Sequence, residues 1–446
     1  MNTCTSVPRK LREAVFTAKI TREKLLEVVV LVLVVTIPPL ISIYMHDPKT
    51  EILFGNFGFK YNDIVHGLAN PIFTSNKRWF NTSTYQSFRD GHYKYPVPYI
   101  DYKFEYPPVV GLIWYLSTST AFTCSSNLEE AIRLHYYIQS VVITAFYAVL
   151  VYSIYSLLKT TRRSVLRLLV FLLPSTFTYM IYNWDVIAAA FAILGVLLIL
   201  REKYFLSGLL QGFSVSTKIL TIGVAFYYIV KLLIVEKRRK PGLKFLVGFT
   251  ISGVLPFILF YIISSRGFLE FLHHHSSWYC ENCIYLLVIQ DIFSSVHKVL
   301  FYTVITVIAS TFLLFGLPWR GISVQEEFKY LFLAVTSLVL FNYVFSPQML
   351  LMITPLAILT LKPLELVVFA LVDVFNALII YTFFKYPNPW LLGSVAQNMA
   401  LMRNLLLLLL FVINAASITW TKLKKELIEL IKIELIKHVS CRDTTL

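Results

Sequence analysis

The chain has 446 residues, of which 57% are hydrophobic and only 15% are charged. Soluble domains carry roughly 25% charged residues, whereas the mean hydropathy here is +0.68. Apolar runs of about 17–25 residues recur along the chain, each long enough to cross a hydrocarbon core of roughly 30 Å. The formal net charge of +15 does not indicate nucleic-acid binding. The basic residues cluster in short loops and at both termini, as the positive-inside rule distributes them.

The first part of the chain predicts one span followed by a long outer loop. The basic N-terminus is expected in the cytoplasm, and a retained span follows over about residues 26–45. The first outer loop, residues 46–133, includes an apolar stretch at 108–124 that is short and broken by Ser and Thr. If this stretch crossed the membrane, the basic loop Lys159–Arg163 would lie outside. We therefore expect a re-entrant or interfacial helix at 108–124.

The remaining apolar runs predict an all-α polytopic bundle of about 12 transmembrane helices with both termini inside. A transmembrane domain is expected over 1–420, with a second large outer loop at 264–293. The tail, 421–446, has apolar residues at helical spacing opposite lysines, which predicts a cytoplasmic amphipathic helix on the inner membrane surface. Asp373 and Arg403 lie inside spans and are expected to pair structurally. The later spans are predicted at 134–158, 165–182, 186–200, two within 204–236 that turn near Thr217–Lys218, 243–263, 295–315, 330–345, 348–361, 364–384 and 397–420.

Several polar residues converge on the outer side in this topology. Asp63 has apolar neighbours, which can raise the pKa of a carboxyl group toward the working range of a general base. The alternative for Asp63 is a solvated acid that caps a helix at Ile64. Asp101, Glu105 and Tyr106 belong to the motif DYKFEYPP, whose aromatic residues suit either a membrane interface or sugar and isoprenoid binding.

Cations lie in the same outer region. Lys218 stands in an apolar context, where an ammonium group is costly unless it is paired. A lipid phosphate would pair with it; snorkelling to the interface is the alternative. Arg266 and the histidine run that ends at His275 could contact an anionic leaving group. Cys280 and Cys283 are close enough for a disulfide on an oxidising side, or for part of a zinc site.

The order of these elements resembles that of the GT-C membrane glycosyltransferases, and most closely the polyprenyl-phosphate-mannose-dependent α-mannosyltransferases. The matching features, over roughly residues 20–420, are an acid soon after the first span, the Tyr-Pro-Pro motif, the segment SGLLQGFSVSTKILTIG, the segment FLEFLHHHSSWYCEN and the Ser-Pro-Gln start in FNYVFSPQMLL. Each motif is short and degenerate, so the resemblance depends on their order.

This resemblance implies a GT-C-like fold and the inverting transfer of a hexose, with mannose as the first candidate, from a polyprenyl-phosphate donor. The acceptor would be a lipid-linked glycan or another hydroxyl. Asp63 stands where the family has its proposed base, and Asp185 matches a second acid of some members. Lys218 and His275 would lie near the phosphate, with Arg266 assisting. Asp101, Glu105 and Tyr106 complete the expected substrate-binding residues.

The same residues bear on cofactors, partners and alternative functions. The first outer loop contains no Asp-x-Asp pair, so we assign no residue as a metal ligand. A divalent metal ion stays open as a cofactor. Membrane lipids are expected partners, in the cell membrane or, in a eukaryote, the endoplasmic reticulum membrane. The alternatives are a transporter or flippase for lipid-linked or small solutes and a lipid-linked-glycan ligase or polymerase. The absence of a visible repeat disfavours an inverted-repeat transporter.

Overall fold

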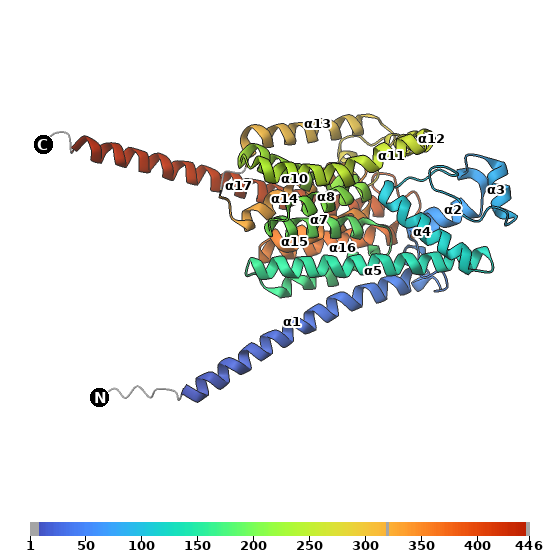
Figure 1. The fold of residues 1–446 in the computed structure, drawn as a ribbon, viewed down its shortest axis with the longest axis horizontal. Coiled ribbons are helices and arrows are strands. Elements are labelled where there is room, and N and C mark those ends of the chain that lie inside the picture. Colours follow the sequence, from blue (N-terminus) through green and yellow to red (C-terminus); the bar gives the residue numbers. More distant parts are fainter. Residues whose placement is uncertain (1–8, 318–320, 443–446) are drawn as a thin grey trace.

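A computed structural model describes the backbone of residues 9–317 and 321–442, and the side chains of residues 23–317, 321–424 and 428. Within these residues the regular structure is helical, with isolated β-bridges only. Most helices run side by side along one axis (Figure 1). The longer helices are α1 (Arg9–His46), α4 (Pro108–Cys124), α5 (Leu128–Thr160), α7 (Asp185–Leu200), α8 (Tyr204–Thr217), α10 (Arg239–Phe249), α12 (Ser265–Ser277), α13 (Val296–Thr311), α14 (Val324–Leu340), α15 (Leu350–Thr360), α16 (Pro363–Lys385) and α17 (Val395–Arg442). The shorter ones are α2 (Asn70–Phe73), α3 (Thr82–Arg89), α6 (Pro174–Tyr179), α9 (Ile222–Ile229) and α11 (Leu255–Ile263).

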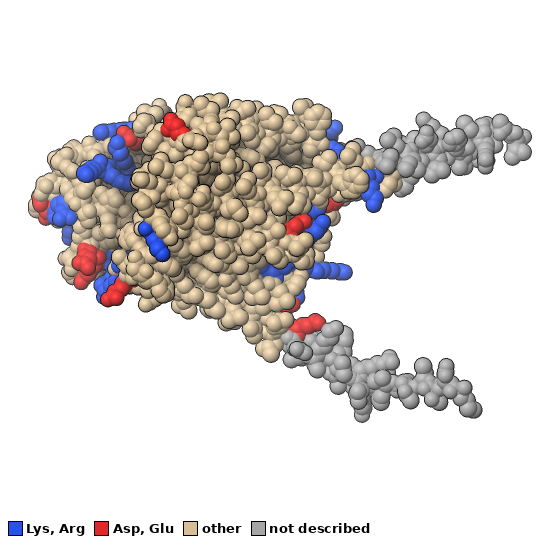
Figure 2. Space-filling view, turned by 180° about the vertical axis from the view of Figure 1, so that it is seen from behind, with Lys and Arg blue, Asp and Glu red and all other residues tan. Residues whose placement is uncertain are grey.

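The two ends of the bundle differ in what they hold. The start of α1 and the end of α17 lie at one end, which we call the inner end. The helices α2, α3 and α12 lie at the other, which we call the outer end (Figure 1). Lys, Arg, Asp and Glu gather mainly toward these two ends on the face in Figure 2, with a broad band of other residues between them. This distribution is typical of a protein that exposes its middle to lipid.

Six helical segments in the described part of the chain are long and apolar enough to cross a membrane, and three shorter apolar helices accompany them. The chain is therefore an all-α polytopic membrane protein, as the sequence predicts. The six are Glu23–His46, Leu128–Thr160, Arg239–Ile263, Val296–Gly316, Pro363–Lys385 and Val395–Lys424. The number of about twelve crossings stays a prediction.

The predicted crossing at 165–182 is not one α-helix. It consists of a 3₁₀-helical stretch, Val165–Leu172, followed by the short helix α6. Leu173 between them is extended, with φ −78° and ψ 155°. The residue before a proline is pushed out of the α region, and Pro174 follows here. The break therefore has a local cause that hydropathy does not reveal.

Helix α4 has the bounds predicted for the re-entrant or interfacial segment. One of its polar residues, Ser117, faces α5. Ser117 lies within hydrogen-bond distance of His135 and accepts a bond from Gln139, both on α5. Gln139 in turn accepts a bond from the indole N–H of Trp184 at 2.9 Å. These buried bonds attach α4 to the outer half of α5, whose 33 residues extend for roughly 50 Å. The depth of α4 in a membrane stays a prediction.

Small residues allow α8 to pack closely between α7 and α10. A Cβ atom on Gly208 would lie 2.0 Å from the carbonyl oxygen of Phe245, so only glycine fits there. On the other side, Ser207 and Ser214 donate hydrogen bonds to carbonyl oxygens of α7, both at 2.7 Å. Close backbone approach and serine bonds are usual between helices in lipid. They fix the end of α8 beside the start of α7, where two predicted site residues lie.

The buried charges Asp373 and Arg403 do not form the expected direct pair. Asp373 accepts a hydrogen bond from the backbone N–H of Ser175 at 2.8 Å. Arg403 donates to the side-chain oxygen of Asn376 at 3.0 Å and to two backbone carbonyls. Asn376 donates to the hydroxyl of Ser175 at 3.0 Å, which links the two charges indirectly. The prediction that Asp373 and Arg403 pair was wrong, because each is hydrogen-bonded to other groups, and Oδ2 of Asp373 has no hydrogen-bond partner among the described residues.

The predicted tail continues the last helix. Helix α17 runs without interruption from Val395 to Arg442, past the expected boundary at residue 420. Most side chains of the tail, and those of the basic N-terminal residues up to Arg22, lie outside the described residues. The amphipathic placement of the tail on the inner membrane surface therefore stays a prediction.

Candidate active site

Asp63 begins a π-helical turn, Asp63–Ala69, at the outer end. The side chain of Asn62 caps this turn by accepting a hydrogen bond from the backbone N–H of Val65 at 2.7 Å. The backbone N–H of Asp63 donates to the carbonyl oxygen of Tyr182 at 2.9 Å. Ile64 is fully buried and anchors the turn. Asn62 therefore has the capping role that the alternative interpretation gave to Asp63, and the Asp63 carboxylate is left for other contacts.

The carboxylate of Asp63 is held by a tyrosine from the Tyr-Pro-Pro motif. The hydroxyl of Tyr106 donates to Oδ2 of Asp63 at 2.7 Å, and the amide of Asn183 lies 3.5 Å from the same oxygen. Within the described residues, Oδ1 has no hydrogen-bond partner. Burial raises the pKa of Asp63 to about 7, assisted by the charges of Glu105 and Glu281 and opposed by the Tyr106 bond and Lys218. A general base works best with a pKa near the operating pH.

Lys218 and Asp185 form an ion pair next to this acid. The ammonium nitrogen lies 3.0 Å from Oδ1 of Asp185, whose side chain is 1% exposed, against 15% for Lys218. It also lies 6.0 Å from the ring centre of Tyr106. Oδ2 of Asp185 is buried and bonds no other described group. Lys218 thus faces inward to an acid and does not snorkel away from the bundle.

Glu105 is the centre of a second charged group. It pairs with Arg78 at 3.0 Å, and the imidazole of His274 lies 3.8 Å from the same carboxylate oxygen. Burial raises the pKa of Glu105, while the charge of Arg78 opposes that rise. His274 belongs to the histidine run that the sequence singled out, whereas no local pattern reveals that Arg78 reaches Glu105.

His275 ties α12 to the Tyr-Pro-Pro segment. Its Nε2 lies 3.0 Å from the carbonyl oxygen of Glu105, and because a carbonyl only accepts, Nε2 must be the donor. The hydroxyl of Tyr343 donates to the backbone oxygen of His275 at 2.6 Å. Burial lowers the pKa of His275 to about 4. The imidazole is therefore neutral at pH 7 and would act on a phosphate by hydrogen bonding and not by charge.

Two predicted residues lie apart from this cluster. Arg266, near the start of α12, stacks over the ring of Phe80 at 4.5 Å and is about nine residues, roughly 13 Å along the helix, from His275. Asp101 accepts hydrogen bonds from the hydroxyl of Tyr93 and the backbone N–H of Val97, both at 2.6 Å. These bonds fix a turn of the first outer loop.

Glu281 is a charged residue of this region that sequence reasoning missed. It lies between Cys280 and Cys283, which are joined in a disulfide, the outcome left open from their spacing. One oxygen of Glu281 accepts a hydrogen bond from the indole N–H of Trp278 at 2.8 Å. The pKa of Asp63 is raised most by burial, less by the charge of Glu105, and least by the charge of Glu281. The conspicuous cysteines were the only sequence signal that could have drawn attention to it.

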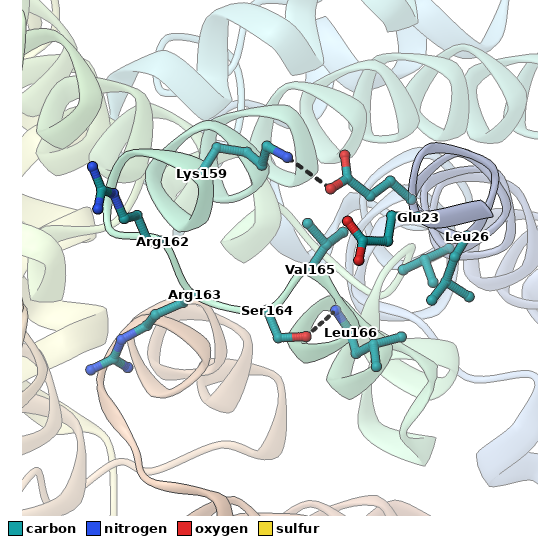
Figure 3. A pocket seen from close by; sticks show the side chains of 10 residues that line it. Glu23, Leu26, Lys159, Arg162, Arg163, Ser164, Val165 and Leu166 are labelled. Atoms are coloured by element: carbon teal, nitrogen blue, oxygen red, sulfur yellow. Dashed lines mark hydrogen bonds and ion pairs between the residues drawn. The ribbon is translucent and has the colours of Figure 1, made fainter. Parts of the chain in front are cut away.

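A separate hollow of about 410 Å³ opens at the inner end, between α1 and the end of α5. Lys159 there pairs with Glu27 at 2.7 Å. Figure 3 shows Arg162 and Arg163 on the opposite side of the hollow from Glu23. No residue predicted for the site lines this hollow, so it is distinct from the outer cluster.

A comparison with known protein families identifies the family of the chain. The sequence model of Glycosyltransferase family 87 matches residues 104–342, just over half of the chain. The matched region includes Glu105, Tyr106, Asp185 and Lys218, whereas Asp63 precedes it. No curated protein matches the chain. This chain therefore belongs to glycosyltransferase family 87 and is a membrane glycosyltransferase.

Proposed function

We propose that this chain transfers a hexose, with mannose the first candidate, from a polyprenyl-phosphate donor to a hydroxyl of a lipid-linked glycan or another acceptor. The reaction would take place at the outer face of the cell membrane or, in a eukaryote, at the lumenal face of the endoplasmic reticulum membrane. The observation that supports this proposal best is Asp63, a partly buried acid whose pKa is raised to about 7 and whose Oδ1 is left without a partner.

The proposed reaction uses Asp63 as general base. Its carboxylate takes the proton of the acceptor hydroxyl while the acceptor oxygen forms a bond to the anomeric carbon of the donor sugar. The bond from that carbon to the phosphate oxygen breaks, and the polyprenyl phosphate leaves with the electron pair. Attack on the face opposite the leaving group inverts the anomeric configuration. The hydroxyl of Tyr106, 2.7 Å from Oδ2, orients the carboxylate.

The leaving phosphate needs positive charge close to the breaking bond. Lys218 supplies it in this proposal, because its ammonium group lies 6.0 Å from the ring centre of Tyr106, which bonds Asp63, and its charge opposes the burial-driven rise in the pKa of Asp63. The ammonium group has three donor hydrogens, of which one satisfies Asp185. Asp185 thereby fixes the position of the ammonium group. His275 and Arg266 are less direct candidates, since one is neutral and bound to a carbonyl and the other stacks on Phe80.

The test is a transfer assay with purified protein and radiolabelled polyprenyl-phosphate mannose or glucose, with and without EDTA. The EDTA arm measures whether a divalent cation takes part. We expect Asp63→Asn to lower the rate by about 10²–10⁴-fold, the usual contribution of a general base. The matched control is Asp90→Asn, an exposed acid of the same loop that accepts a bond from Gln86. Full activity of Asp63→Asn would contradict the assignment of the base.

A further inference from the structure

The segment between Cys280 and Cys283 is fixed on several sides. The disulfide joins its two ends. The backbone N–H of Glu281 donates to the carbonyl oxygen of Tyr343 at 3.0 Å, and its carbonyl accepts from the N–H of Phe345 at 2.9 Å. The carbonyl of Asn282 accepts bonds from Arg403 and Asn404 of α17. The backbone of Glu281 therefore has little freedom while the disulfide is intact.

The side chain of Glu281 is also oriented. The indole N–H of Trp278 donates to one carboxylate oxygen at 2.8 Å, and the other oxygen has no partner among the described residues. Trp278 itself is packed between the imidazole of His274 and the ring of Tyr279, with ring centres 4.7 and 5.4 Å away. A carboxylate that is half-buried, positioned and half-satisfied is suited to accept a hydrogen bond from a further group.

Hydrogen bonds and short stretches of backbone connect the main chain of Glu281 to the proposed base. Tyr106 bonds Asp63, and its neighbour Glu105 offers its carbonyl to His275. Tyr343 bonds His275 through its hydroxyl and Glu281 through its carbonyl. The charge of Glu281 adds to the rise in the pKa of Asp63, as expected of two carboxylates in the same region.

The charge of Glu281 decides which substrate it suits. A phosphate would be repelled by it, and the cations Lys218 and Arg78 are paired with the other acids, Asp185 and Glu105. A neutral molecule with several hydroxyl groups would instead donate to both carboxylates, one hydroxyl to Asp63 and another to Glu281. Such an arrangement recognises a sugar or polyol better than a single hydroxyl on a peptide.

We propose that Glu281 binds a second hydroxyl group of a sugar acceptor, and that the Cys280–Cys283 disulfide holds Glu281 in position for it. This inference rests on the proposed function and narrows its acceptor to a sugar. Glu281 is then a substrate-binding residue, and the disulfide acts through it.

The first experiment measures binding without turnover, so that its outcome does not depend on the donor. Octyl α-mannopyranoside is titrated into the protein by calorimetry, with Glu281→Gln as the variant. We expect affinity to fall about 10- to 100-fold, the range for losing a hydrogen bond to a charged group. The matched control is Glu270→Gln, an acid on α12 that pairs with Lys103 at 2.9 Å. No binding by the wild type, or equal binding by Glu281→Gln, overturns the inference.

The second experiment tests the disulfide through acceptor kinetics. Reduction with a phosphine should raise the KM for the sugar acceptor in the wild type, leave the KM for the donor within about twofold, and reverse on reoxidation. In Glu281→Ala, reduction should cause no further change, because two perturbations of one contact are not additive. Cys124→Ser, which removes an exposed free thiol, is the control. If reduction raises the acceptor KM of Glu281→Ala by the same factor as that of the wild type, the role of the disulfide is overturned.

The two experiments separate this inference from the proposed function. If the wild type binds the mannoside through Glu281 but transfers no sugar from either polyprenyl phosphate, the proposed donor is wrong and the sugar site remains. If transfer occurs and Glu281→Gln changes neither binding nor the acceptor KM, the inference is wrong and the proposed function remains.

Discussion

Replacing Tyr106 with Phe tests how the structure sets the protonation of Asp63. The substitution keeps the aromatic ring and removes the hydroxyl that donates to Oδ2 at 2.7 Å. This bond stabilises the charged carboxylate, so its loss must raise the pKa of Asp63 further. The acid limb of the pH profile of kcat/KM reports this pKa in the free enzyme.

The size of the effect follows from the bond type. A hydrogen bond to a charged group contributes about 1.5–3 kcal/mol, and one pKa unit corresponds to 1.36 kcal/mol. In the wild type the acid limb should have its midpoint near pH 7. In Tyr106→Phe the midpoint should move up by about one to two pH units, and the rate at pH 7 should fall about 5- to 50-fold. At pH 9 much of the loss should disappear.

The assay is the transfer reaction measured from pH 5 to about pH 9 at low substrate concentration. The matched control is Tyr93→Phe, which removes a similar bond from a tyrosine to Asp101 at 2.6 Å, away from the proposed base. Its profile should be that of the wild type. An acid limb that stays in place in Tyr106→Phe, or moves to lower pH, would refute the assignment of Asp63 as the base under the control of Tyr106.

The remaining predictions concern stability. Lys218→Met leaves the buried carboxylate of Asp185 unpaired, which should cost about 3–5 kcal/mol, and the double variant with Asp185→Asn should recover the melting temperature in detergent without recovering transfer. Recovery of both would show that Lys218 has only a structural role. Folding raises the pKa of Asp63 from 3.8 to about 7, so the native state binds more protons than the unfolded state between these pH values. The free energy of unfolding therefore falls as pH rises through that window. Asp63→Asn should therefore raise the melting temperature more at pH 8 than at pH 5, and a pH-independent difference would contradict the shift.

Much of the fold could be predicted because hydropathy and charge are local properties. The bounds of α4 at Pro108–Cys124 and the turn at Thr217–Lys218 agree with the sequence reading. The stretch at 165–182 was less predictable, because Pro174 and a 3₁₀ stretch replace a continuous helix that hydropathy alone would suggest. The prediction that Asp373 pairs with Arg403 was wrong, since the positions of two charges in the sequence do not reveal which polar side chains lie between them.

The sequence by itself determined that the chain is a helical membrane protein and that Asp63 is an acid in an apolar setting. These follow from the cost of placing charge and unpaired backbone groups in hydrocarbon. Only the tertiary structure decided which charges meet. Tyr106 reaches Asp63 from 43 positions away, and Glu281 comes to the same region through a disulfide-bounded turn. Such contacts depend on how packed helices align their ends, and no local pattern encodes that alignment.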